Sequence, residues 1–302
     1  MNYKQQNENE VIIKLDGRMG NKMFQWAFGR AFEAKNGIMP IFDDSKETLK
    51  LDCFKLSKEI KTIHKPLWNK ILRKTILFRN LRNKLTELKV IYPQYKEETI
   101  CLYQPDLFEV TPPAYISGYF QTEKYFEQIR ERLQKDFQLT KPLNNANKEI
   151  LEKIRNTNSV SIHFRRGDYL KSRVAANFGN IGEQYYHDAI KYVSENTSES
   201  LTLFVFSDDI NWIRKNIKFG HETVYVDINA GKQGYFDLEL MKNCKHNIIA
   251  NSSFSWWDGW LNENHNKIVV MPSPVRPNKP DYDRIPESWV KCKPYFGGLK
   301  NE

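Results

Sequence analysis

The sequence has few cysteines and arranges none of them for metal or redox chemistry. Its 302 residues include only Cys53, Cys101, Cys244 and Cys292, and no two of these form a CxxC pair. A CxxC pair is the usual sign of a zinc or thiol–disulfide site, so neither is expected here. Scattered single thiols fit a reducing compartment, and we expect a cytoplasmic protein.

Long apolar runs are also missing. No segment approaches the roughly 20 apolar residues that a membrane-spanning helix needs. The first residues, MNYKQQNENE, lack the basic and then apolar pattern of a signal peptide. We therefore predict neither a membrane span nor export.

The two common phosphate-binding signatures, GxxxxGK[ST] and GxGxxG, are absent as well. What the chain does have is a 40% hydrophobic composition, which is enough to bury a sizeable core. Its length predicts about two domains.

The excess positive charge is confined to one segment. The chain carries a net charge of +9, and residues 55–89 alone hold 11 Lys and Arg against 2 Asp and Glu. Apolar residues recur at helical spacing over 66–89, which predicts a basic amphipathic helix inside an insertion. Such a helix could make the chain a binding protein that docks on nucleic acid or an anionic membrane, could give an enzyme a peripheral membrane contact, or could simply face solvent. Only Trp68 and Phe78 could stack on bases, so we expect no nucleic-acid partner.

The first half opens as a βα unit. Residues 11–15 read as a short strand, residues 16–21 as a glycine-rich turn, and residues 22–35 as a helix that stops at Gly37.

A polar, turn-rich stretch, residues 136–159, separates the two halves. We place the domain limit within it, giving domains 1–145 and 146–302.

The second half alternates strands with helical segments such as 185–193. The predicted strands cover 159–164, 201–206, 223–226, 247–250 and 267–271. This alternation predicts a parallel α/β sheet, in which ligands bind beyond the carboxyl ends of the strands. Three polar clusters follow such ends: Arg165 to Asp168, Ser207 to Asp209, and Asn251 to Ser253. Their coincidence predicts an active site.

The clusters suit a nucleoside diphosphate. Arg165 and Arg166 offer planar, permanently charged forks that match phosphate oxygens. Asn251 to Ser253 form the predicted start of a helix, which also favours an anion. Asp208 or Asp209 could accept hydrogen bonds from a base or a ribose.

Each element also has a plainer interpretation. The arginine turn could be a salt-bridged surface loop, and the aspartates could cap the next helix. Three tryptophans of the second half are more typical of a core than of a sugar platform: Trp256, Trp257 and Trp260.

Four segments together resemble one known family. His163 to Asp168 (HFRRGD) resembles the HxRRxD motif of bacterial α-1,2-fucosyltransferases, glycosyltransferase family 11. Residues 17–25 resemble its N-terminal GG(L/M)GNQMFQ motif. Residues 206–209 (FSDD) and 240–257, which ends in ANSSFSWW, resemble its two later motifs.

The resemblance implies an α/β fold of the GT-B type, with two Rossmann-like domains facing a central cleft. It implies inverting transfer of L-fucose from GDP-β-L-fucose to the 2-hydroxyl of a terminal β-galactoside, with no metal and no other cofactor. The acceptor would be an O-antigen unit or a lactose-like glycan, bound on the side of domain 1–145.

Roles carry over by position. Arg166, helped by Arg165, would hold the β-phosphate of the donor, and Asp208 or Asp209 would contact the guanosine. Asn251, Ser252, Ser253 and Phe254 would line the phosphate and base pocket. Gly20 and Asn21 would approach from the N-terminal domain.

The acceptor hydroxyl must lose a proton during the transfer. His163, Asp168 and Glu183 are candidate bases by residue type, and a late proton transfer to a phosphate oxygen would need none of them.

Three positions depart from the family pattern: Arg18 replaces a glycine, Lys22 replaces a glutamine, and Asp258-Gly259 stands where Gly-Ala is usual. A competing hypothesis is a metal-dependent sugar transferase that uses the Asp-x-Asp of Asp281 and Asp283. Because no strand precedes that motif, we interpret it as a loop.

Overall fold

The computed structural model describes residues 9–44, 51–58, 60, 92–167, 178–229 and 231–297. The chain divides into two compact units, Met1–Gln138 (unit 1) and Leu139–Glu302 (unit 2). The division falls inside the polar stretch 136–159, slightly before the expected limit at residue 145.

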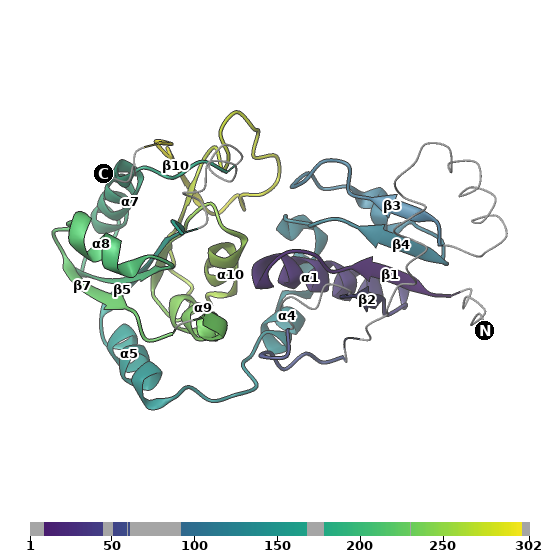
Figure 1. Ribbon diagram of the computed structural model, residues 1–302, viewed down its shortest axis with the longest axis horizontal. Helices are drawn as coiled ribbons and strands as arrows, with labels where there is room; N and C mark the ends of the chain where they lie inside the picture. Colours follow the sequence, from purple (N-terminus) through teal and green to yellow (C-terminus); the bar gives the residue numbers. More distant parts are fainter. Residues whose placement is uncertain are drawn as a thin grey trace. The chain divides into compact units, whose positions relative to one another are not determined.

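Unit 1 is built on a parallel sheet with the strand order β2-β1-β4-β3 (Figure 1). Its strands are β1 (Val11–Lys14), β2 (Ile41–Asp43), β3 (Gln94–Lys96) and β4 (Ala114–Ser117). Its described helices are α1 (Met19–Asn36), η2 (Pro105–Phe108), η3 (Glu123–Tyr125), η4 (Glu127–Ile129) and α4 (Arg130–Asp136).

Helix α1 begins earlier than the sequence predicts. Gly17 adopts φ +85°, and the carbonyl of Arg18 already accepts the N–H groups of Asn21 and Lys22, at 3.0 and 3.1 Å. The turn is therefore shorter than predicted, and the helix starts at Met19. The predicted stop is confirmed, because Gly37 forms the left-handed C-cap with φ 70°.

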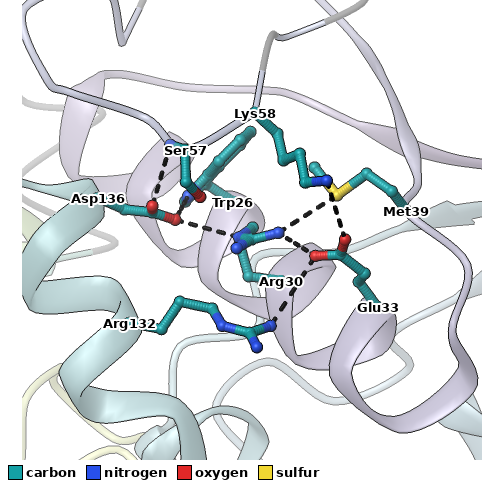
Figure 2. A network of polar contacts seen from close by, with 8 residues as sticks. All are labelled: Trp26, Arg30, Glu33, Met39, Ser57, Lys58, Arg132 and Asp136. Carbon is teal, nitrogen blue, oxygen red and sulfur yellow. Dashed lines mark hydrogen bonds and ion pairs between the residues drawn. The ribbon is translucent and has the colours of Figure 1, made fainter.

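A buried polar network ties the last helix of unit 1 to α1. Oδ2 of Asp136 accepts hydrogen bonds from Nε1 of Trp26, at 2.9 Å, and from Nε of Arg30, at 3.1 Å. Oδ1 accepts the backbone N–H of Ser57 at 3.0 Å. Figure 2 shows Arg30 between Asp136 on one side and Glu33, its second acidic partner, on the other. One carboxylate thereby joins three segments that are distant in sequence.

Unit 2 is a doubly wound parallel sheet with the strand order β10-β9-β8-β5-β6-β7 (Figure 1). Its strands are β5 (Asn158–Phe164), β6 (Leu201–Ser207), β7 (Glu222–Val226), β8 (His246–Ile248), β9 (Val269–Pro272) and β10 (Val290–Cys292). Its described helices are α5 (Asn145–Arg155), α7 (Glu183–Glu195), α8 (Ile210–Asn216), η6 (Gly231–Gln233), α9 (Gly234–Lys242) and α10 (Ser253–Leu261).

Successive side chains of a strand point to opposite faces of this sheet, and a hydrophobic core packs against each face. In β6, Leu203 and Val205 pack into the core that contains α7, whereas Phe204 and Phe206 pack against α5 and α9. The three α10 tryptophans are at most 1% exposed, which confirms their interpretation as core residues.

The strand order reverses at β5. The chain runs outward through β6 and β7, then crosses back to place β8 on the other side of β5. Connections leave the sheet in opposite directions at such a switch point, and ligands of doubly wound folds bind there.

Within the described ranges, no helix combines the length and the apolar character required to cross a bilayer.

Candidate active site

The carboxyl ends of three neighbouring strands bring the predicted clusters of unit 2 together. β5 is followed by two arginines, β6 by two aspartates, and β8 leads to Asn251. These strands are adjacent, in the order β8-β5-β6. Phe164 pairs with Ser207, so β5 and β6 end at the same level of the sheet. All three clusters therefore occupy one edge of the sheet, at its switch point.

Asp208 holds the arginine turn in place. Its Oδ1 accepts the backbone N–H groups of Arg166 and Gly167, at 2.8 and 3.0 Å, and its Oδ2 lies 2.7 Å from Nη1 of Arg165. A Cβ on residue 167 would lie 2.9 Å from that Oδ2, so glycine at this position leaves room for the carboxylate. Burial raises the pKa of Asp208, but the Arg165 charge and the two N–H groups outweigh it and keep the pKa below its ordinary value. The carboxylate is ionised at neutral pH.

Arg166 is buried, with only 2% of its side chain exposed. Its Nε donates to Oδ2 of Asp209 at 3.1 Å, and its Cζ lies 3.4 Å from the centre of the Trp212 ring. Asp209 occupies the N-cap position of α8, but its side chain makes no capping hydrogen bond. Both aspartates therefore bind arginine side chains, and a contact of either with guanosine stays a prediction.

His163 lies on β5, just before the arginine turn, and its ring packs against Phe254 with 5.6 Å between the ring centres. Burial and the charge of Arg165 lower the pKa of His163 to about 4, although Asp208 opposes the shift. Among the described residues, Nδ1 finds no hydrogen-bond partner. The imidazole is therefore neutral at physiological pH.

The predicted helix start after β8 is confirmed. Ser252 is the N-cap of α10, and its Oγ accepts the N–H of Phe254 at 3.3 Å. Nδ2 of Asn251 donates to the carbonyl of Phe178 at 2.7 Å. Ser253 and Phe254 are half-buried in the first turn. The helix thus presents its positive end next to the arginine cluster, an arrangement that favours a bound anion.

Gly20 and Asn21 lie in the first turn of α1, in unit 1. Oδ1 of Asn21 accepts a hydrogen bond from Nε2 of Gln121 at 2.8 Å. A Cβ on residue 17 would lie 2.4 Å from Nδ2 of Asn21, so Gly17 leaves the space that this amide occupies. Sequence reasoning missed Gln121 because it is 100 residues away from its partner.

The remaining candidates are Asp168, segment 66–89 and Glu183. Asp168 and segment 66–89 lie outside the described residues. Glu183 is the first residue of α7, and its Oε1 lies 3.1 Å from Nε2 of His187.

Asp281 of the Asp-x-Asp segment accepts hydrogen bonds from nearby residues of the same chain region. Asp281 accepts hydrogen bonds from Oγ of Ser273, at 2.7 Å, and from the N–H of Val275, at 2.6 Å. Across the described part of the chain, no group of three or more His, Cys, Asp or Glu side chains is placed to hold a metal ion.

Two departures from the family pattern have structural partners. Lys22 is buried, and its Nζ lies 2.6 Å from Oδ1 of Asp44, also buried. Asp258 is fully buried in α10, where it accepts the N–H of Gly259 at 2.6 Å. A Cβ on residue 259 would lie 2.8 Å from Val269 and 3.3 Å from Trp289. The absence of a side chain at Gly259 therefore accommodates Val269 first and Trp289 second.

The profile of glycosyl transferase family 11 matches residues 1–291. The chain belongs to this family. An α-1,2-colitosyltransferase of Escherichia coli is 33% identical over 304 residues, 94% of this chain and 99% of that protein. Galactoside α-(1,2)-fucosyltransferase 1 of Ateles belzebuth is 24% identical over 258 residues, 82% of this chain and 64% of that protein.

The fold has a counterpart among solved structures. A mutant of Arabidopsis thaliana FUT1 in complex with GDP matches with a TM-score of 0.51 at 10% identity, over 89% of this chain and 71% of that one. The predicted fold class, α/β of the GT-B type, is confirmed. The predicted enzyme class is confirmed at the level of a family 11 glycosyltransferase.

Proposed function

We propose that this family 11 enzyme transfers L-fucose, with inversion, from GDP-β-L-fucose to the 2-hydroxyl of a terminal β-galactoside. The observation that carries the proposal is the pair of arginines at the end of β5, held by two aspartates beside the positive end of α10. Two guanidinium groups and a helix N-terminus can together balance a diphosphate. The names of the α-1,2-colitosyl and α-(1,2)-fucosyl relatives support the linkage, and the second supports the galactoside.

Colitose is the second candidate sugar. It is L-fucose without the 3-hydroxyl, and the 33% identical relative over nearly the full chain is a colitosyltransferase. Both sugars would reach the site as GDP donors and would place the same diphosphate on Arg165 and Arg166.

Arg166 is the principal group of the proposed mechanism. As the glycosidic bond breaks through an oxocarbenium-like transition state, negative charge grows on the departing β-phosphate. A buried, oriented guanidinium stabilises this growing charge more than it stabilises the bound donor, and such differential binding accelerates the reaction.

We assign no protein side chain as the base that removes the proton of the acceptor hydroxyl. A pKa of about 4 makes His163 a weak base, so we assign this neutral ring to the wall of the donor site rather than to proton transfer. Asp168 and Glu183 stay candidates by residue type. We propose late deprotonation, with a phosphate oxygen of the leaving group as the acceptor.

A donor panel tests the proposal. Purified protein is given GDP-fucose, GDP-colitose, GDP-mannose or UDP-galactose with lactose, and release of the nucleoside diphosphate is measured. We expect turnover with one or both 6-deoxy donors and none with UDP-galactose. Turnover with UDP-galactose alone would refute the proposed donor class.

An acceptor panel tests the position of attack. Methyl β-galactoside is compared with its 2-deoxy analogue, which lacks only the attacked hydroxyl. We expect transfer to the first and none to the second. Equal transfer to both would refute the 2-linkage. O-antigen units and lactose-like glycans are then ranked as natural acceptors.

Peripheral contact of segment 66–89 with an anionic membrane is a separate proposal, supported only by the charge of that segment. Vesicles with and without anionic lipid would test it, and equal binding to both would refute it.

A further inference from the structure

Trp212 lies in the first turn of α8, three residues after Asp209. Its ring lies against the guanidinium of Arg166, whose Cζ is 3.4 Å from the ring centre. The ring is half-buried and also packs against the core on the α7 side of the sheet. Trp212 therefore connects that core directly to the arginine cluster.

Arg166 is held at two different places by this one helix turn. Asp209 binds Nε, on one edge of the guanidinium, and Trp212 covers a face. A guanidinium donates its hydrogen bonds in its own plane, so stacking uses none of its N–H groups but restricts its tilt. The Asp209 contact restrains the guanidinium within its plane, and the stack on Trp212 restrains the tilt of that plane.

We propose that Trp212 is a positioning residue for the transfer reaction. It fixes the plane of the Arg166 guanidinium so that the fork can bind the β-phosphate of the donor in a bidentate manner. The inference rests on the proposed function, because it requires a diphosphate at Arg166. It adds a residue from outside the arginine and aspartate clusters to the site.

A purely structural role for Trp212 makes a different prediction. A tryptophan that only fills the core would lower stability when removed, whatever residue stands at 166. A positioning residue lowers turnover only while Arg166 is present. A double-mutant cycle between the two positions separates these roles.

The test uses full-length Trp212→Leu, Trp212→Phe, Arg166→Ala and the double variant Trp212→Leu/Arg166→Ala. We expect Trp212→Leu to lower kcat with GDP-fucose and lactose about tenfold, the order of a largely desolvated cation–π contact. The donor KM should change much less, because the arginine acts mainly in the transition state. Trp212→Phe keeps an aromatic face and should recover most of kcat. In the Arg166→Ala background, Trp212→Leu should cause no further loss.

The same helix offers a matched control. Arg214 of α8 pairs with Asp227 and lies over the ring of Tyr225, 5.2 Å from its centre. Tyr225→Leu therefore removes a second arginine–aromatic contact outside the cluster, and kcat should stay near the wild-type value. Thermal unfolding of all variants reports any shared loss of stability.

Binding of GDP by calorimetry separates failure of the inference from failure of the proposed function. If wild-type protein binds GDP but the kcat effects of Trp212→Leu and Arg166→Ala multiply independently, the positioning role is refuted. The positioning role is also refuted if Trp212→Leu has the same kcat as Tyr225→Leu. If wild-type protein does not bind GDP, the proposed function is refuted and the inference falls with it.

Discussion

At the scale of single residues, Arg166 tests the proposed mechanism most directly. Arg166→Ala should lower kcat by on the order of 10²–10³, the usual loss for one preorganised charge-stabilising group. Affinity for GDP should fall as well, because the product keeps the same phosphates. Steady-state kinetics and GDP titration measure both effects. If the Arg166→Ala protein unfolds normally and keeps a nearly normal kcat, Arg165 rather than Arg166 would be the group that stabilises the β-phosphate charge.

Asp258 gives a pH-dependent prediction that does not involve catalysis. Burial raises its pKa well above the ordinary value of 3.8, despite the Gly259 N–H and Lys267. The folded chain therefore keeps the carboxyl protonated, whereas the unfolded chain ionises it above pH 3.8. The contribution of Asp258 to stability is thus present at low pH and is lost progressively as the pH rises from about 4 toward the raised value.

Asp258→Asn should therefore gain in Tm over wild-type protein as the pH rises from 4 to 7. Asp106→Asn, on the exposed surface of η2, is the control and should show no such trend. A difference in Tm between Asp258→Asn and wild-type protein that stays constant with pH would contradict the assignment.

Single residues also show where sequence reasoning stops. The residue types and the strand-end positions of Arg165, Arg166 and Asp208 were sufficient to predict that they come together at one edge of the sheet. Their sequence separation gave no information on pairing, so the ion pair between Asp208 and Arg165 was not predicted. The partners of Lys22 and Asn21 are 22 and 100 residues away, and only the folded chain reveals them.

At the scale of elements, the start of α1 depends on Gly17. Gly17→Ala should destabilise the protein by about 1–2 kcal/mol, because alanine is strained at positive φ, and its Cβ would displace the amide of Asn21. Gly37→Ala, at the other end of the same helix, carries a similar backbone strain with no atom within 4 Å of the new Cβ. Both variants should lose stability in urea unfolding, but only Gly17→Ala should lose transferase activity. Equal activity of the two variants would refute the predicted role of Asn21 in donor binding.

The predictability of each element followed from its length and burial. β5 and β6 are buried strands of seven residues each, and their positions were predicted closely. β2, β3 and β10 have three residues each, too few to establish a period-two pattern. β8 is equally short, but its three residues are all buried, and it overlaps the predicted strand 247–250. α1 began early because its capping geometry depends on Gly17 and the carbonyl of Arg18, whereas an apolar period locates only the body of a helix.

At the scale of the whole molecule, the proposed chemistry predicts independence of metal ions. Because two guanidinium groups and the start of α10 can balance a diphosphate, transfer from GDP-fucose should keep its rate in excess EDTA. The measurement compares initial rates in EDTA with rates in Mn²⁺ or Mg²⁺. A rate that vanishes in EDTA and returns with Mn²⁺ would favour the metal-dependent alternative.

The family and the GT-B class were recognisable from four short segments because these hold the residues that end strands and begin helices. The same segments do not identify the acceptor. No family motif covers residues 45–110, which belong to unit 1. The acceptor must therefore be identified by experiment, with the acceptor panel.

The Asp136 network has a consequence for how such enzymes can be recombined. Asp136 fixes the last turn of unit 1 onto Trp26, Arg30 and Ser57, and unit 1 ends only two residues later, at Gln138. Unit 1 therefore completes this network before the joint is reached. A division of the chain between Gln138 and Leu139 leaves the whole Asp136 network in unit 1 and the whole arginine cluster in unit 2. We propose that relatives can exchange halves at this joint, and the family resemblance implies that such a chimera would combine the acceptor of one parent with the donor of the other.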